Sequence, residues 1–365
     1  MIEETLGRQD EYRLRRQRLI PVLREARVSG FLVTALPNIR YLSGFTGSNA
    51  ALLITEDRAL LFTDPRYQTQ AAQESDCEVK IAKGPLTGEL CKWLARLKLT
   101  SVAFEQNRIS YQDYLELREG LKGVRFKALA DSVEMLRMRK SPSEIATIRT
   151  SVKLNSAALE HALRHFHTSM TEIDLAAEIE YRMRQLGADG TAFETIVASG
   201  PRSALPHAHP TGHPIHRDQL LLMDMGAAVA GYASDMTRTY AVGKLDAKIR
   251  RMYRAVLESQ LAAIDAIRPG ITCSAIDRAA RDVLRRSGLD KLFLHSTGHG
   301  LGLEIHERPR VGRKEQTKLE AGMVITIEPG VYMEGLGGVR IEDTVAVTAH
   351  GSEVLTPTGK ELVIL

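Results

Sequence analysis

Two aspartates adjoin apolar, strand-like sequence in the second half of the chain. The run Leu220–Met223 leads into Asp224, and Asp235 stands just before a second strand-like run. If residues 228–231 form a hairpin turn, the two aspartates lie directly opposite each other, with Cβ atoms about 4.5 to 5.5 Å apart. The sequence therefore predicts a pair of facing carboxylates.

Two glutamates repeat this arrangement near the C-terminus. Glu328 and Glu342 each adjoin an apolar run, and the glycine-rich stretch between them is centred on Gly335. Like charges that face each other destabilise a sheet, and carboxylates on apolar strands lose their hydration. A pair of divalent cations is the simplest compensation for four such acids.

A segment rich in glycine and histidine, residues 295–307, separates the two predicted hairpins. It contains His295, His299 and His306. Four carboxylates and one imidazole form an oxygen-rich ligand set, which suits Mn²⁺, Co²⁺ or a similar divalent ion better than a thiolate-rich structural zinc site does. Two ions about 3.5 to 4 Å apart activate a water molecule against a carbonyl carbon, so the implied chemistry is hydrolysis.

Each of these residues also has an ordinary structural explanation. An aspartate at the end of a strand commonly serves a turn, and a lone histidine beside glycine commonly makes a structural hydrogen bond. Two matched acid pairs and a histidine cluster in one domain favour the metal site. The loop 205–210 adds His207 and His209, for which a surface position is the default unless the loop reaches the metals.

The residues that carry chemistry fall in the second of two predicted domains. The sequence turns polar at residues 135–143, and Ser141 or Ser143 is a candidate cap for the long helical pattern that follows. We place one domain at residues 1–135 and the other at residues 141–365.

The first domain is predicted to be an α/β domain. A helical pattern over residues 12–26 alternates with short apolar runs such as residues 30–34 and 50–54, and a turn-rich stretch covers residues 37–48. The basic run of the first helical pattern predicts a solvated helix face. Its members are Arg13, Arg15, Arg16 and Arg18.

The second domain is predicted to be an α+β domain with a pseudo-two-fold internal repeat. Residues 173–177 on one amphipathic helix return as residues 276–280 on another, and each helix follows a longer one and precedes strand-rich sequence. Such a repeat places a site between its two halves.

Composition excludes several classes of protein. The 365 residues are 44% hydrophobic and carry a net charge of +4, with basic and acidic residues interspersed, so neither a nucleic-acid partner nor a membrane span is expected. The first twenty residues have charges where a signal peptide needs apolar sequence. Three scattered cysteines fit a reduced cytoplasm.

Several blocks of the sequence, in order, resemble those of metallopeptidase family M24, in the branch of Xaa-Pro aminopeptidases and Xaa-Pro dipeptidases (prolidases). PNIRYLSGFTGS and FTDPRY are similar to the creatinase-type N-terminal domain. The catalytic blocks of the family match MDMGAAVAGYASDMTRTY, HSTGHGLGLEIHE, ITIEPGVY and GVRIEDTV. The resemblance implies a pita-bread fold for the second domain.

The resemblance also assigns residues. It implies that Asp224 binds one metal, that Asp235 and Glu342 bridge two metals, and that His299 and Glu328 bind the other. Glu328 additionally relays a proton to the leaving nitrogen. The remaining site residues that it implies are the histidines His207, His295 and His306, which contact substrate or stabilise the tetrahedral intermediate, and the supporting residues Tyr332 and Arg340.

The activity implied by the resemblance is hydrolysis of the Xaa-Pro bond at the N-terminus of short peptides by an enzyme with two divalent metals, of which Mn²⁺ is preferred over Co²⁺ or Zn²⁺. A prolidase restricted to dipeptides is the alternative, and a homodimer is implied by resemblance only. Methionine aminopeptidases usually lack a domain like residues 1–135. A non-catalytic peptide-binding scaffold fits poorly with a complete ligand set.

Overall fold

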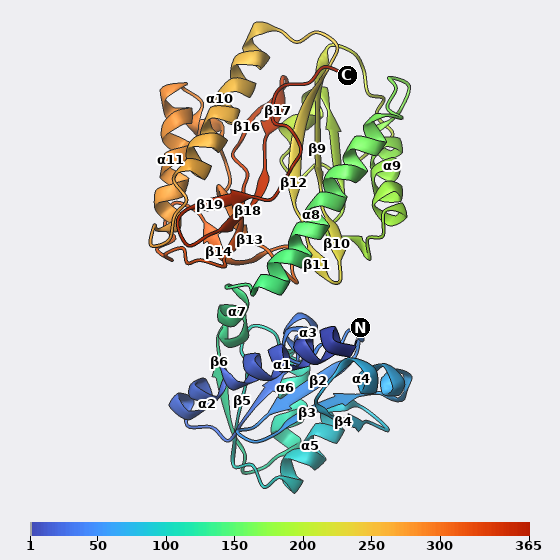
Figure 1. Cartoon of the computed structure of the whole chain (residues 1–365), viewed down its shortest axis with the longest axis vertical. Helices are drawn as coiled ribbons and strands as arrows, with labels where there is room; N and C mark the ends of the chain where they lie inside the picture. The colour runs from blue at the N-terminus through green and yellow to red at the C-terminus, as the bar shows by residue number, and fades with distance from the viewer. Residues whose placement is uncertain (1) are drawn as a thin grey trace. The chain divides into compact units, whose positions relative to one another are not determined.

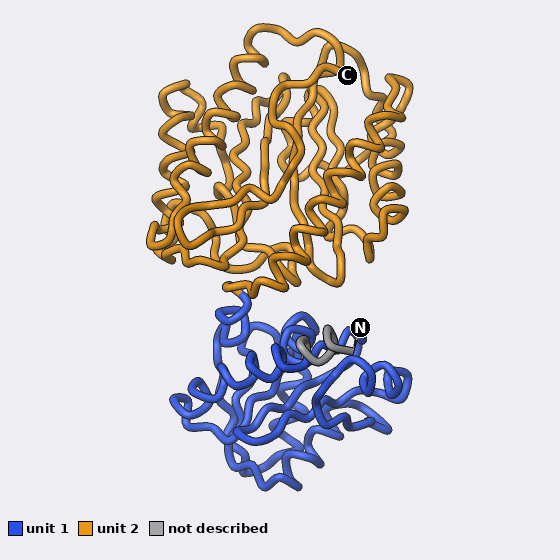
Figure 2. Tube along the Cα trace, viewed as in Figure 1, with its two compact units in different colours: residues 1–137 blue, residues 138–365 orange. Residues whose placement is uncertain are grey.

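The computed structural model describes residues 2–365, with side chains from residue 9 onward. The chain separates into two compact units, Met1–Arg137 and Met138–Leu365 (Figures 1 and 2). None of the helices described is long and apolar enough to cross a bilayer.

Unit 1 is built on a six-stranded sheet of order β4-β3-β2-β1-β5-β6. Strand β2 runs antiparallel to both of its neighbours, and the other neighbouring strands are parallel. The strands are β1 (Gly30–Val33), β2 (Ala50–Ile54), β3 (Ala59–Thr63), β4 (Glu78–Ile81), β5 (Ser101–Glu105) and β6 (Arg125–Leu129). The helices are α1 (Ile2–Gln17), α2 (Ile20–Ala26), α3 (Leu36–Ser43), η1 (Pro65–Tyr67), α4 (Gln68–Glu74), α5 (Leu86–Arg96), α6 (Tyr111–Gly120) and α7 (Ser132–Arg137). The predicted α/β architecture is confirmed.

Two predictions for unit 1 are wrong. The stretch expected to be rich in turns contains helix α3, which ends at Ser43 and is capped by Gly44, where a φ of 78° favours glycine. The basic run expected on a solvated face is partly buried. Arg15 donates to the carbonyl oxygen of Tyr41, and Arg16 forms an ion pair with Asp76. These partners lie far away in sequence, so helical periodicity cannot reveal them.

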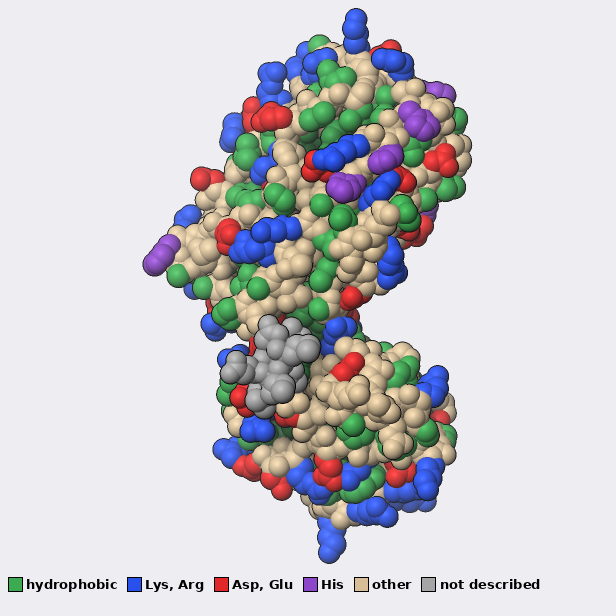
Figure 3. All heavy atoms as spheres, turned by 45° about the vertical axis from the view of Figure 1, so that its right-hand side comes forward, with side chains coloured by type: hydrophobic (Ala, Val, Ile, Leu, Met, Phe, Trp, Pro, Cys, Tyr) green, Lys and Arg blue, Asp and Glu red, His purple; other side chains and the backbone are tan. Residues whose placement is uncertain are grey.

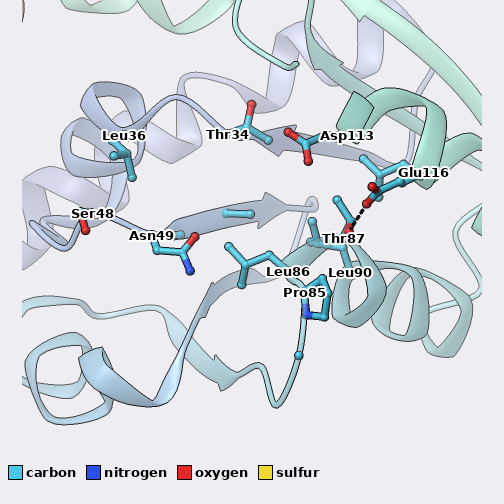
Figure 4. Close-up of a pocket in the computed structure, with 14 residues that line it drawn as sticks. Thr34, Leu36, Ser48, Asn49, Pro85, Leu86, Thr87, Leu90, Asp113 and Glu116 are labelled. Carbon is cyan, nitrogen blue, oxygen red and sulfur yellow. Dashed lines mark hydrogen bonds between the residues drawn. The ribbon is translucent and has the colours of Figure 1, made fainter. Parts of the chain in front are cut away.

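A cavity of about 510 Å³ opens in unit 1 beside the ends of β1 and β2, next to α5 and α6 (Figure 4). Asp113 and Glu116 line it, but each already accepts a hydrogen bond: from Ser110 in the first case and from Thr87 in the second. In the part of the chain that the structure describes, the group of residues whose ligand atoms could hold a metal ion lies in unit 2 instead.

Unit 2 consists of two similar halves, each with a helix pair followed by strands. The first pair is α8 (Pro142–Leu163) and α9 (Glu172–Gln185), and the second is α10 (Ala247–Asp265) and α11 (Cys273–Arg286). Ser141 caps α8, and the side chain of Glu144 accepts from the Ser141 backbone in return, which completes a capping box. The predicted repeat of helices and strands is confirmed.

Strands fill the space between the helix pairs, with α8 and α9 on one side and α10 and α11 on the other (Figure 1). The first half contributes β7 (Gly190–Thr191), β8 (Ile196–Ser199), η2 (Gly200–Ala204), β9 (Gln219–Met225), β10 (Ala227–Val229), β11 (Tyr232–Ala233) and β12 (Met236–Val242). The second half contributes η3 (Asp290–Leu292), β13 (Gly298–Gly300), β14 (Glu307–Val311), β15 (Val324–Ile327), β16 (Gly330–Met333), β17 (Gly337–Arg340), β18 (Asp343–Val347) and β19 (Ser352–Val354). The sheets are β12-β9-β8, β11-β10-β7, β14-β13-β15-β18-β19 and β16-β17.

The five-residue echo that indicated the repeat does not mark structurally equivalent positions. Asp174 stands three residues after the cap Thr171, is exposed, and completes a capping box. Asp277 stands five residues after the cap Thr272 and is buried. The two aspartates therefore serve different purposes in the two halves.

The surface of unit 2 mixes side chains of both charges. On the face seen in Figure 3, lysines and arginines are interspersed with acidic side chains and histidines. The charge pattern expected from the composition is therefore visible on this face.

Candidate active site

Strands β9 and β12 position the first two acids in a register different from the predicted one. Asp224 lies opposite Thr237 rather than Asp235, because the hairpin loop consists of Ala230 and Gly231 alone. Asp235 is therefore offset by two residues from the predicted position. Side chains alternate between faces with a period of two, so both carboxylates still reach the same cavity.

The second hairpin has the predicted register. Gly330 lies opposite Arg340 in β16 and β17, and β15 and β18 continue the same register beyond a short interruption. Glu328 and Glu342 occupy the facing positions within that interruption. The prediction that these two acids face each other is confirmed.

His299 approaches the acids from β13. Its Nδ1 atom lies 3.0 Å from the carbonyl oxygen of Gly300, which only accepts, so Nδ1 carries the proton and Nε2 presents a lone pair to the cavity. Nε2 lies 3.5 Å from Asp235 Oδ2 and 3.4 Å from Glu328 Oε1. Atoms that share one metal ion at about 2.1 Å lie roughly this far apart.

The cluster fits divalent metal ions by the chemistry of its donors. Ligand atoms of Asp235, His299 and Glu342 all lie within 4.8 Å of one another. Asp224 Oδ1 and Glu342 Oε1 are buried without a hydrogen-bond partner. Leaving a buried carboxylate oxygen unpaired costs free energy, and a cation at this point removes that cost.

Burial and mutual repulsion make these carboxylates reluctant to ionise without a cation. Burial raises the pKa of Asp235 and Glu342 well above the ordinary values, and the neighbouring carboxylates raise them further. Burial likewise raises the pKa of Glu328 to about 7. A metal ion would favour the ionised form of all three acids.

A chain of hydrogen bonds runs behind the acids from Arg340 to His295. Arg340 Nη2 lies 2.6 Å from Asp224 Oδ2, and Nη1 donates to the Tyr332 hydroxyl at 2.7 Å. The Tyr332 hydroxyl lies 2.9 Å from His295 Nε2, and burial lowers the pKa of His295 to about 4, so the neutral ring accepts from Tyr332. His295 Nδ1 donates a hydrogen bond to the Ser296 carbonyl oxygen. His295 is thus held at both ring nitrogens.

The other two predicted histidines open onto the cavity, whose volume is about 650 Å³. His306 lies with its ring centroid 4.4 Å from that of His299. His207 comes from the loop after η2, and His209 on the same loop also lines the cavity and lies 3.1 Å from Glu194. The loop therefore reaches the cavity that contains the acids, so its histidines are placed for a role in the site.

The structure thus brings together all ten predicted site residues, with Tyr332 behind the cavity wall rather than among its lining residues. The lining residues include the predicted Asp224, Asp235, His299, Glu328, Glu342, His207, His295, His306 and Arg340. Tyr332 joins them through its hydrogen bonds to Arg340 and His295.

Three residues of the site escaped the sequence reasoning. Thr237 Oγ1 donates to Glu342 Oε2 at 2.7 Å and accepts from Arg340 Nε at 3.0 Å. Thr326 Oγ1 accepts from the His299 backbone and lies 3.3 Å from Glu328 Oε1. Arg310 faces His299 across β13 and β14 and lines the cavity. The alternation along the second strand puts Thr237 on the face of Asp235, and this signal was available in the sequence.

Comparison with known proteins identifies the family to which the chain belongs. The model of metallopeptidase family M24 matches residues 146–349, and that of the creatinase/prolidase N-terminal domain matches residues 15–139. The chain belongs to metallopeptidase family M24. The resemblance inferred from the sequence is confirmed, as are the two-part fold and the peptidase class.

Individual relatives of this M24 peptidase cover nearly its whole length. It is 36% identical over 348 residues to a protein named Xaa-Pro dipeptidase from Pyrococcus horikoshii, over 95% of this chain and 98% of that one. A structure of an Xaa-Pro dipeptidase from Bacillus anthracis is similar with a TM-score of 0.94 and 39% identity, over 97% of this chain and 100% of that one. The X-Pro aminopeptidase from Thermotoga maritima has a TM-score of 0.88 and 36% identity, over 94% and 100% of the chains.

Proposed function

We propose that this M24 peptidase hydrolyses the Xaa-Pro bond at the N-terminus of short peptides, as an Xaa-Pro aminopeptidase. The observation that carries the proposal is the convergence of four acids and His299 on one cavity, with buried carboxylate oxygens that lack a partner. The names of the relatives supply the class of bond.

We propose that two divalent ions, preferably Mn²⁺, occupy the cluster. Asp224 would hold one ion, His299 and Glu328 the other, and Asp235 and Glu342 both. Bound there, the ions would supply an activated water and a positive charge for the developing oxyanion. Oxygen-rich ligand sets favour hard ions, so Mn²⁺ is preferred over Zn²⁺ and Co²⁺.

The residues around the cluster divide the remaining work. Proline nitrogen has no proton in a peptide and must gain one as it leaves, and we assign that transfer to Glu328. His207 and His306 line the cavity, and the side chain of neither makes a hydrogen bond to any residue that the structure describes. Both are therefore available to donate to a peptide carbonyl. We assign His295, Tyr332 and Arg340 to holding Asp224 and the cavity wall.

The alternative, a prolidase that accepts only dipeptides, is favoured by one observation. The exposed side chain of Arg310 lines the cavity without an ion pair to any described residue. A free guanidinium at this place suits the C-terminal carboxylate that a dipeptide carries close to its scissile bond.

We also propose how the rest of the chain is used. Residues 1–135 form an N-terminal domain and residues 141–365 the catalytic domain of a homodimer in the cytoplasm. Cys77, Cys91 and Cys273 are free thiols, and Cys77 and Cys273 are buried, which fits a reducing compartment.

The test is a comparison of three peptides in Mn²⁺ buffer: Ala-Pro, Ala-Pro-Ala and, as a control, Met-Ala-Ser. Cleavage of Ala-Pro-Ala with little cleavage of the control supports the aminopeptidase. Cleavage of Ala-Pro alone establishes the dipeptidase instead. Cleavage of the control alone would reject the preference for proline.

A further inference from the structure

A buried ion pair lies on α11, outside the cavity. Asp277 and Arg281 are one helical turn apart, and their side chains are only 1% and 8% exposed. Arg281 Nε lies 2.8 Å from Asp277 Oδ2. Burying an ion pair gains little stability over a well-packed apolar pair, so its contacts with other groups become informative.

Both members of the pair make hydrogen bonds to residues 293–297, the segment that leads into the active site. Arg281 donates from Nη1 to the carbonyl oxygen of Phe293 at 3.0 Å and from Nη2 to that of His295 at 2.5 Å. Its guanidinium carbon also lies 4.1 Å from the centroid of the Phe293 ring. Asp277 Oδ1 accepts a hydrogen bond from the Thr297 hydroxyl at 2.8 Å. The pair therefore fixes three of the five residues from 293 to 297.

This segment is joined directly to two residues of the site. The His295 ring contacts the hydroxyl of Tyr332, as described above. The carbonyl oxygen of Thr297 accepts from the backbone N–H of Glu328 at 2.7 Å. A displacement of the segment would therefore move both His295 and Glu328.

We propose that Asp277 and Arg281 are positioning residues for this peptidase, which hold His295 and Glu328 in place through the segment 293–297. The proposal rests on the proposed function for its catalytic consequence. Neither side chain touches the cavity, so both act only through the residues that they hold.

The first half of unit 2 contains a related arrangement. Glu172, at the start of α9, is fully buried and forms an ion pair with Arg202. Arg202 Nη2 donates to the carbonyl oxygen of His209 at 2.7 Å, two residues beyond His207. Each half thus uses a buried carboxylate on its second helix, together with an arginine, to hold the segment that carries a cavity histidine.

Kinetics of Asp277→Asn test the proposal against a matched destabilised control. Val256→Ala truncates a fully buried residue of α10 in the same core and lowers stability, but it removes no hydrogen bond to the segment. At a temperature well below both melting points, Asp277→Asn should lower kcat for Ala-Pro about 10- to 100-fold with two metals still bound, whereas the control keeps the wild-type kcat. Equal kcat values in the two variants would overturn the proposal.

A double-mutant cycle identifies the route of the effect. If the pair acts through His295, Asp277→Asn should cost much less in a His295→Ala background than in the wild type. Arg281→Lys keeps the buried charge but loses the fork that binds two carbonyls, and it serves as the second variant should Asp277→Asn fail to fold. Full additivity in the cycle, together with a wild-type kcat in Arg281→Lys, would contradict a positioning role.

A spectroscopic measurement separates this proposal from the proposed function. The imidazole resonances of His295, assigned by their loss in His295→Ala, should shift in Asp277→Asn and stay in place in Val256→Ala. This shift is expected even if the wild-type protein cleaves no proline peptide. Unmoved resonances in Asp277→Asn would reject the positioning role, and a wild type inactive on every Xaa-Pro peptide would reject only the function.

Discussion

Arg340 places a fixed positive charge against the carboxylate of Asp224, with Nη2 at 2.6 Å from Oδ2. Arg340 is only 2% exposed, and the same guanidinium reaches Tyr332 and Thr237. Arg340 is therefore the protein's own partial compensation for a cluster of two buried and two partly buried acids, and the metal ions would supply the rest.

Replacing Arg340 should destabilise the metal-free protein more than the metal-loaded protein. Arg340→Met leaves Asp224 without its partner, and breaking a buried pair costs about 3 to 5 kcal/mol. Bound Mn²⁺ supplies positive charge to the same acids, so the loss should be smaller in the loaded protein. Chemical unfolding with EDTA and with Mn²⁺ measures the difference. An equal loss in both states would contradict the compensating role.

The stability of the metal-free protein should fall as the pH rises above 6.5. Burial raises the pKa of Glu328 to about 7 from an ordinary value of 4.5, so the folded chain holds a proton that the unfolded chain has already released. Unfolding free energy therefore falls as the pH rises through this window. The pKa of His295 is lowered from 6.5 to about 4, so this group makes the unfolding free energy rise with pH. It does so only below pH 6.5.

Melting temperatures between pH 6.5 and 8 test this expectation. The EDTA-treated protein should lose stability across the range, while Mn²⁺ should abolish much of the dependence and Glu328→Gln should reduce it. A melting temperature of the metal-free protein that rises with pH would show that these acids are ionised without a cation.

Thr237 should matter although it binds no metal in the proposed scheme. Its hydroxyl orients Glu342 and accepts from Arg340, and loss of such an outer partner commonly costs about 10- to 100-fold in metal affinity or activity. Thr237→Val should weaken Mn²⁺ binding by this amount. Ser259→Ala is the matched control, because Ser259 is equally buried but donates to the Ala280 carbonyl, away from the acids. Titration calorimetry with Mn²⁺ compares the two, and equal affinities would exclude a role for Thr237.

If the enzyme is the alternative dipeptidase, Arg310 should govern recognition of the substrate carboxylate. Arg310→Gln should raise KM for Ala-Pro about tenfold or more, since a charge-assisted hydrogen bond contributes about 1.5 to 3 kcal/mol. Ala-Pro-amide lacks the charge and provides the control, so its KM should hardly change. A similar increase for both ligands would mean that Arg310 acts on the shape of the cavity instead.

The acids of the site were predictable because their strands carry clear signals. Gly335 has a φ of 76° and marks the turn that brings Glu328 and Glu342 face to face. The first hairpin misled the prediction at one residue. Ala230 has a φ of 45°, and a two-residue loop normally has asparagine, aspartate or glycine at such a position. The predicted turn over residues 228–231 is longer than this two-residue loop, and the difference shifts the register by two.

Other features depend on contacts that no local pattern encodes. Arg310 reaches the cavity because β14 pairs with β13 across an irregularity next to His299. Asp277 and Arg281 are four residues apart, which is a common spacing on helices. Only the packing of α11 against residues 293–297 shows which backbone groups the pair holds. Arg16 pairs with Asp76, which lies sixty residues away in the sequence. Long-range pairing of this kind becomes visible only in the folded chain.

The most direct test of the central claim is a titration of the metal-free protein with Mn²⁺ while Ala-Pro hydrolysis and bound metal are both measured. Activity should be absent without metal and should reach a plateau when two ions are bound per chain. Asp235→Ala should remain folded and fail to gain activity at any Mn²⁺ concentration. Undiminished hydrolysis by the metal-free protein, or full activity of Asp235→Ala, would contradict the assignment of a two-metal peptidase.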